Sequence, residues 1–165
     1  MTADRTAGRV IDDVAELADG RGALIGLDLG TKTIGVAVSD GLRLTATGLE
    51  TIKRTRLSVD AGRIGEIAEG RGAVGIILGL PRNMDGSDGP RVQSTRAFAR
   101  NLAGILPLPI AFWDERLSTV AVERTLIAAD SSRKRRAEVV DKLAAAFILQ
   151  GALDRLACLT ERPHD

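Results

Sequence analysis

The residues of this chain best suited to chemistry are carboxylates at the ends of apolar segments. Asp28 lies inside the apolar run 25–29, where a carboxylate is costly to bury unless a cation, a metal or a hydrogen-bond donor meets it. Asp114 and Glu115 follow a short apolar segment, and Asp141 lies near the start of a long helical pattern. Oxygen ligands suit hard cations such as Mg²⁺ or Mn²⁺, and two such ions can bracket a phosphate. These points could converge if the last helix packs across the first strand.

Each carboxylate also has a plainer interpretation. Asp28 could bond the backbone of the turn that follows it. Asp114 or Glu115 could form a surface ion pair with Arg116, and Asp141 could serve only the dipole of its helix. Spacing alone does not choose between these interpretations.

The sequence offers few residues for other kinds of catalysis. His164 is the single histidine and stands next to the C-terminus, which excludes a Ser–His–Asp mechanism in all but the least favourable geometry. The lone cysteine, Cys158, leaves no intrachain disulfide and no cysteine-based metal cage, and a cytoplasmic protein fits this best. The net charge of +1 means that any surface for a polyanion must come from local clustering of charge.

Several basic and polar residues are candidates for contact with phosphates. A basic run at 133–136 comes just before Asp141 and could hold a phosphate backbone there, or it could be a solvated loop. The turn-rich segment 83–90 follows a buried strand and could be a flexible substrate loop or a tight connection. The candidate phosphate-binding residues are Lys32, Arg82, Asn83, Arg133, Lys134, Arg135 and Arg136.

The elements that must position these residues follow from hydrophobic periodicity. Two apolar runs separated only by a short turn predict an antiparallel hairpin, and a third strand follows it. Alternating helices and strands then predict an α/β fold: a mixed sheet with an antiparallel three-strand meander, parallel strands, and helices on both faces. The expected strands are 25–29, 34–38, 44–52, 73–80 and 109–113, and the expected helices are 59–68, 91–102, 118–129 and 139–156.

The first residues of the chain are expected to be an extension of a single domain. Val10, Ile11, Val14 and Leu17 follow helical spacing, which predicts a short amphipathic helix or a frayed tail over 1–22, with the domain at 23–160. The acidic N-terminus lacks the apolar core of a signal peptide. No apolar stretch is expected to reach the roughly 18 residues of a membrane span, so no membrane partner is expected.

Sequence motifs in order along the chain resemble the YqgF family. They are Gly-Leu-Asp-Leu-Gly at 26–30, Ile-Gly-Val-Ala-Val-Ser-Asp at 34–40, Leu-Gly-Leu-Pro-Arg-Asn-Met-Asp-Gly-Ser at 78–87, Gly-Pro-Arg at 89–91, Asp-Glu-Arg-Leu-Ser-Thr at 114–119 and Val-Asp-Lys-Leu-Ala-Ala at 140–145. These bacterial proteins are similar to Holliday-junction resolvases, and a role in pre-16S rRNA processing is described for them. The resemblance implies an RNase H-like fold with a catalytic and metal-binding triad at Asp28, Glu115 and Asp141.

The favoured function is therefore a metal-dependent nuclease for structured nucleic acid, with the 5′ end of precursor 16S rRNA as substrate. Branched DNA is the alternative substrate, and a resolvase cutting two strands symmetrically would need a homodimer, whereas a monomer would suffice for rRNA trimming. A non-catalytic ribosome-assembly module, binding ribosomal particles, is an alternative of another class. Asp-Leu-Gly-Thr at 28–31 also resembles the phosphate loop of sugar kinases and Hsp70-type ATPases, but the chain is too short for their second half.

Overall fold

The computed structural model describes residues 8–18, 20–83, 85–117 and 133–160, without the side chains of 133–139. Its centre is a six-stranded sheet with the order β1-β6-β5-β2-β3-β4. The strands are β1 (Arg9–Ile11), β2 (Ala23–Leu29), β3 (Thr33–Ser39), β4 (Ala46–Lys53), β5 (Ala73–Leu80) and β6 (Pro109–Asp114). The helices are the 3₁₀ turns η2 (Val14–Leu17) and η3 (Glu115–Leu117), and the α-helices α1 (Leu57–Arg71), α2 (Pro90–Ala103) and α4 (Arg133–Thr160).

The sheet is mixed, as the hydrophobic pattern predicts. Strand β2 pairs antiparallel with β3, and β3 pairs antiparallel with β4. Strands β5 and β6 run parallel to β2 on its other side. Strand β2 is buried along its whole length, because helices cover both faces of the sheet, and this explains why its sequence is nearly continuous in apolar residues.

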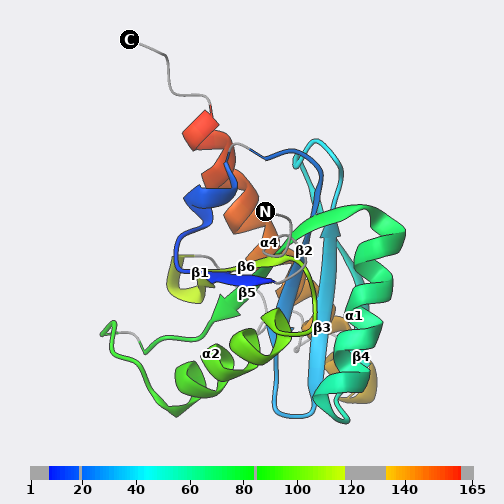
Figure 1. The fold of residues 1–165 in the computed structure, drawn as a ribbon. Helices are drawn as coiled ribbons and strands as arrows, with labels where there is room; N and C mark the ends of the chain where they lie inside the picture. The colour runs from blue at the N-terminus through cyan, green and yellow to red at the C-terminus, as the bar shows by residue number, and fades with distance from the viewer. Residues whose placement is uncertain (1–7, 19, 84, 118–132, 161–165) are drawn as a thin grey trace.

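Helices lie on both faces of the sheet (Figure 1). Each face has its own hydrophobic cluster of buried residues. On one face, α1 and α2 pack against alternate strand residues such as Leu27 and Phe112. On the other face, α4 and η2 pack against the intervening residues, such as Leu24 and Ile77. Because side chains alternate along a strand, each strand residue can be assigned to the α2 face or the α4 face.

The expectation of one amphipathic helix near the N-terminus is wrong. Val10 and Ile11 belong to β1, which pairs parallel with the edge of β6, and only Val14–Leu17 form a helical turn. Asp13 caps this turn by accepting a hydrogen bond from the Ala15 amide at 2.9 Å. The buried positions Ile11, Val14 and Leu17 produce a helix-like spacing in the sequence. Ile11, however, pairs with Ala111 of β6 and so belongs to the sheet.

Helix α4 begins earlier and ends later than the predicted 139–156. Its segment Val140–Thr160 is long and apolar enough to cross a membrane by length and composition, contrary to the expectation that no segment would be. A core helix passes the same test, and α4 buries Ala145, Ile148 and Leu149 in the core. The predicted helix 118–129 lies outside the described residues.

Two glycines let α4 approach the sheet backbone closely. A Cβ atom on Gly26 would lie 2.7 Å from the Cβ of Leu149, and one on Gly35 would overlap the carbonyl oxygen of Asp141. Such contacts leave no room for any side chain larger than hydrogen. Helix α4 therefore lies directly on β2 and β3, backbone against backbone, and the position of Asp141 over the sheet is set by these contacts.

Candidate active site at the carboxyl end of the central strands

Asp28 is placed on the α4 face of the central strand. It lies two residues after Gly26, which contacts α4, and its register partner on β3 is Gly35. The residue is 8 % exposed, and it has an interaction partner, as does Glu115. A carboxylate this deeply buried is stable only with such compensation, and the structure agrees with the sequence in burying it.

Asp141 reaches the same place from α4. Its peptide group stacks on Gly35, the residue opposite Asp28. Its carboxylate accepts a hydrogen bond of 2.6 Å from the hydroxyl of Thr33, at the start of β3. The close backbone contact and this hydrogen bond together hold the carboxylate of Asp141 beside the β2–β3 hairpin.

Glu115 approaches from the other side of β2. It follows β6 directly, and its Oε1 atom lies 3.1 Å from where a Cβ on Gly79 would stand. Strands β2 and β5 pair in parallel, with Leu27 opposite Leu78. The residues that follow, Asp28 and Gly79, therefore lie side by side at the end of the two strands. The fold therefore brings Asp28, Glu115 and Asp141 to one end of the sheet and to its α4 face.

These positions suit a hard cation without forming a ready-made cluster. Within residues 8–160 as far as they are described, no group of three His, Cys, Asp or Glu side chains is arranged to hold a metal ion. Mg²⁺, however, is commonly bound by one or two carboxylates together with phosphate oxygens of the substrate. The all-oxygen donors, and the space that Gly79 leaves for Glu115, fit an ion completed by substrate.

Asp114 has a different role from its neighbour Glu115. The Arg116 guanidinium binds its carboxylate through two nitrogen atoms, with Nη2 at 2.6 Å from Oδ2. Hydrogen bonding by Arg116 lowers the pKa of Asp114 below its usual value. Asp114 lies two residues after Phe112 along β6 and so shares its α2 face. The surface ion pair weighed from the sequence is therefore formed by Asp114, while Glu115 reaches the α4 face.

The predicted phosphate-binding residues are dispersed. Lys32 is exposed in the β2–β3 turn, close in sequence to Asp28. Arg82 contacts Asp88 and Asp114 at 3.3 and 3.8 Å, and the Asn83 amide donates to the Ser87 hydroxyl at 3.0 Å. The four residues Arg133, Lys134, Arg135 and Arg136 begin α4, but their side chains lie outside the described part of the chain.

The segment after β5 is internally hydrogen-bonded, which is the arrangement of a tight connection. The backbone N–H of Asn83 donates to the backbone carbonyl of Ser87 at 3.1 Å, and the backbone N–H of Gly86 donates to the carbonyl of Asn83 at 2.9 Å. Ser87 donates to the carboxylate of Asp85 through both its amide and its hydroxyl. These hydrogen bonds lower the pKa of Asp85.

Sequence reasoning misses three residues that brace this end of the sheet. Arg54 and Arg91 donate to the carbonyl oxygens of Gly30 and Leu29, at 2.6 and 3.4 Å, just beyond Asp28. Thr33, the third, lies in the turn between the two predicted hairpin strands. Arg91 stands in the Gly-Pro-Arg motif at 89–91, but the sequence assigns neither arginine a partner, because their acceptors are main-chain atoms.

The sheet order and the two helical layers define an RNase H-like fold. The fold of T. thermophilus RuvC, solved in complex with a Holliday junction substrate, matches with a TM-score of 0.51 at 15 % identity, over 82 % of this chain and 96 % of that one. The family model RuvX, described as Holliday junction resolvase, matches residues 22–155. The chain belongs to this family, which is the YqgF family indicated by its motifs.

Curated relatives cover nearly the whole chain. One from Cereibacter sphaeroides is 73 % identical over 135 residues, covering 82 % of this chain and 84 % of the relative. One from Bradyrhizobium sp. is 69 % identical over 139 residues, covering 84 % and 86 %. One from Paracoccus denitrificans is 64 % identical over 149 residues, covering 90 % and 94 %. All three bear the name "Putative pre-16S rRNA nuclease".

Proposed function

We propose that this protein is a metal-dependent nuclease that hydrolyses phosphodiester bonds in structured RNA, and that it processes the 5′ end of precursor 16S rRNA in the cytoplasm. The observation that supports the proposal is that the fold places Asp28, Glu115 and Asp141 at one end of the sheet and on its α4 face. The names of the relatives support the choice of substrate, and ribosomal particles are its expected partners.

In this proposal the three carboxylates are the ligands of Mg²⁺ or Mn²⁺. When bound, such an ion supplies positive charge beside the phosphate and makes water more acidic. Asp28 contributes its charge from the rigid central strand, and Glu115 contributes from η3. Asp141 is oriented by the hydroxyl of Thr33, so that its carboxylate keeps one position while substrate enters.

Branched DNA is the second candidate substrate. The description of the family as Holliday junction resolvase favours it, and contacts to phosphates carry no information that separates RNA from DNA. A non-catalytic assembly module would keep the fold and its nucleic-acid surface without turnover. The expected oligomeric state differs between the RNA nuclease and the DNA resolvase, since symmetric cutting of two DNA strands needs two active sites.

Cleavage of defined substrates tests these alternatives directly. Labelled precursor 16S rRNA and a four-way DNA junction would be incubated with the protein in Mg²⁺, in Mn²⁺ and with chelator. We expect cleavage of the rRNA precursor with either ion, loss with chelator, and recovery when the ion is restored. Preferential cutting of the junction would make the protein a resolvase, and binding without cutting of either substrate would make it an assembly module.

Replacement of Thr33 by valine should slow cleavage without abolishing substrate binding. Valine keeps the shape of threonine but removes the hydroxyl that holds the Asp141 carboxylate. We expect kcat to fall roughly tenfold with KM little changed, and stability to fall by about 1 kcal/mol. Thr33→Ser is the matched control, because it keeps the donor and should retain most activity. Unchanged kcat in Thr33→Val would show that this hydrogen bond does not orient a catalytic group.

Neutralising the basic run should weaken binding to nucleic acid of any sequence. With Arg133, Lys134, Arg135 and Arg136 all changed to glutamine, the slope of log Kd against log salt should fall by about 0.7–0.9 for each phosphate that these side chains neutralise in the parent protein. The control carries the same charge change at four exposed positions elsewhere: Arg21, Arg71, Arg100 and Arg155. Equal slopes for the two variants would mean that the run is a solvated segment.

A further inference from the structure

A pocket of about 290 Å³ lies beside the candidate active site, at the same end of the sheet but on its α2 face. Leu80 and Asp114 are register partners and the last residues of β5 and β6. Crevices at the carboxyl ends of parallel strands are common ligand sites in α/β folds. The side chains that line the pocket are Asp12, Leu80, Arg82, Arg96, Phe112 and Asp114.

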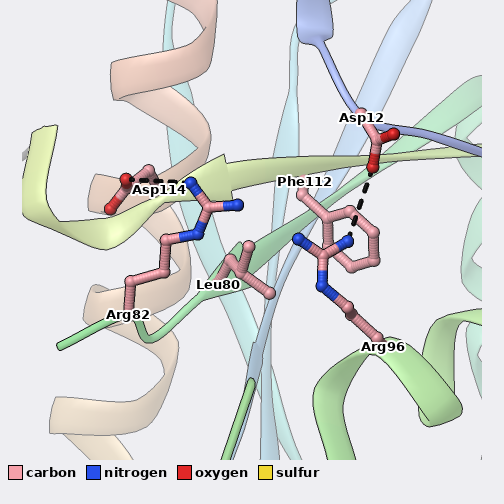
Figure 2. A pocket seen from close by; sticks show the side chains of 6 residues that line it. All are labelled: Asp12, Leu80, Arg82, Arg96, Phe112 and Asp114. Carbon is pink, nitrogen blue, oxygen red and sulfur yellow. Dashed lines mark hydrogen bonds and ion pairs between the residues drawn. The ribbon is translucent and has the colours of Figure 1, made fainter. Parts of the chain in front are cut away.

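Two arginines from different elements face this pocket. Figure 2 shows the guanidinium groups of Arg82, from the segment after β5, and Arg96, from α2, on either side of Leu80. The Arg96 guanidinium carbon lies 5.0 Å from the centre of the Phe112 ring, and this contact favours a fixed orientation of the side chain. Among the described residues, the buried Arg82 Nε makes no hydrogen bond, and it lies 3.3 Å from Oδ1 of Asp88.

Three carboxylates lie near these arginines, and each contact is long or exposed. Asp88 lies 3.3 Å from Arg82, and its side chain is 44 % exposed. Asp114 is bound tightly by Arg116, and its nearest oxygen lies 3.8 Å from Arg82. Asp12 faces Arg96 at 3.4 Å, but its side chain is 89 % exposed. An ion pair with so exposed a partner as Asp12 contributes little to stability, and the Arg82–Asp114 contact is weakened by its length. A stronger acceptor entering the pocket can therefore replace them.

We propose that this pocket binds a phosphodiester group of the substrate strand, at a position away from the bond that is cleaved, with Arg82 and Arg96 as the donors. The proposal rests on the nuclease function proposed above. Guanidinium groups match phosphate oxygens with two parallel hydrogen bonds. Phe112 is only 6 % exposed and lies under Arg96, so its ring is not available for stacking with a base. The pocket would therefore hold the backbone without reading sequence.

The order of residues along β6 explains how one strand of nucleic acid could reach both sites. Asp114 faces the pocket on the α2 face, and Glu115, the next residue, reaches Gly79 on the α4 face. The pocket and the candidate active site thus lie on opposite faces of the sheet, at the same end of its strands. A nucleic-acid strand that passes over this end would contact both, and the arginines would fix its path relative to Asp28.

A pair of arginine variants on one helix tests the pocket. Arg96→Gln removes the pocket donor, whereas Arg100→Gln makes the same charge change at an exposed position one turn along α2. Binding to precursor 16S rRNA would be measured as a function of salt. We expect Arg96→Gln to weaken binding roughly tenfold and to lower the salt slope by about 0.7–0.9, with Arg100→Gln close to the parent protein. Equal affinities and slopes for the two variants would overturn the proposal.

A second measurement separates this proposal from the proposed function. The trinucleotide UpUpU would be titrated into ¹⁵N-labelled protein, with uridine as the control without phosphate, and the arginine Nε–H signals followed by NMR. Saturable shifts of Arg82 and Arg96, but not of Arg100, would support the pocket even if the protein left precursor rRNA uncut, an outcome that would reject the nuclease function alone. Cleavage of the precursor with unchanged Arg82 and Arg96 signals would reject the pocket and leave the nuclease function standing.

Discussion

Hydrolysis is expected to be lost when Asp28 is changed to asparagine, while the fold survives. The amide has the shape of the carboxylate but no charge, so it fits the same buried position opposite Gly35 and cannot attract a cation in the same way. Loss of one preorganised electrostatic group at a reacting phosphate costs about 10²–10³-fold in rate. We therefore expect cleavage in Mg²⁺ to fall by at least that much, measured at saturating precursor rRNA.

The stability of the Asp28→Asn variant should match or exceed that of the parent without metal. Like charges that meet at one site repel each other, and the amide removes one of them. The matched control is Asp154→Asn, an exposed position on α4, which should cleave like the parent. Near-full, metal-dependent activity in purified Asp28→Asn would remove Asp28 from the mechanism. Equal loss in both variants would instead indicate an effect on the fold.

Gly35→Ala should produce the largest loss of stability of any single change considered. The added Cβ would overlap the carbonyl oxygen of Asp141 and lie 2.5 Å from its carbonyl carbon. Neither atom belongs to a side chain that could rotate away, so α4 or β3 must move. Overpacking in a rigid core costs about 1–3 kcal/mol and sometimes more, and we expect about 3 kcal/mol or more here, measured by urea unfolding.

The control for Gly35→Ala is an alanine placed where there is open space. Gly62 lies within α1, and a Cβ atom added there would have no neighbour within 4 Å. Alanine favours a helix over glycine by about 1 kcal/mol, so Gly62→Ala should stabilise the protein. If Gly35→Ala were as stable as the parent, the close packing of α4 on the hairpin would not be what fixes Asp141 over the sheet.

Much of the sheet could be predicted from the sequence because its central strands are buried on both faces. The predicted strand 73–80 coincides with β5, and the antiparallel hairpin agrees with β2 and β3. Strand β1 could not be predicted, since it has only three residues and is held in place by the edge of β6. Pairing with a distant edge leaves no local pattern, and the spacing of its apolar residues imitates a helix.

The candidate site was predictable in part. An acid inside an apolar run marks Asp28 by its cost of burial, and this is a local property of the sequence. The choice between Asp114 and Glu115 depends on which face each residue takes at the end of β6, which the spacing did not decide. The contact between Asp141 and Gly35 joins residues more than a hundred positions apart in sequence, and no local physical rule predicts it.

The alternation at the end of β6 also makes this site sensitive to chain length. A single residue inserted or deleted within β6 would exchange the faces of every residue after it. The carboxylate now bound by Arg116 on the α2 face would turn toward α4, and the carboxylate now over Gly79 would turn away from it. The acidic pair itself would be unchanged. Which of its two carboxylates reaches the α4 face therefore depends on the number of residues in β6, so an alignment of relatives shifted by one residue here would assign the candidate metal-binding role to the wrong carboxylate.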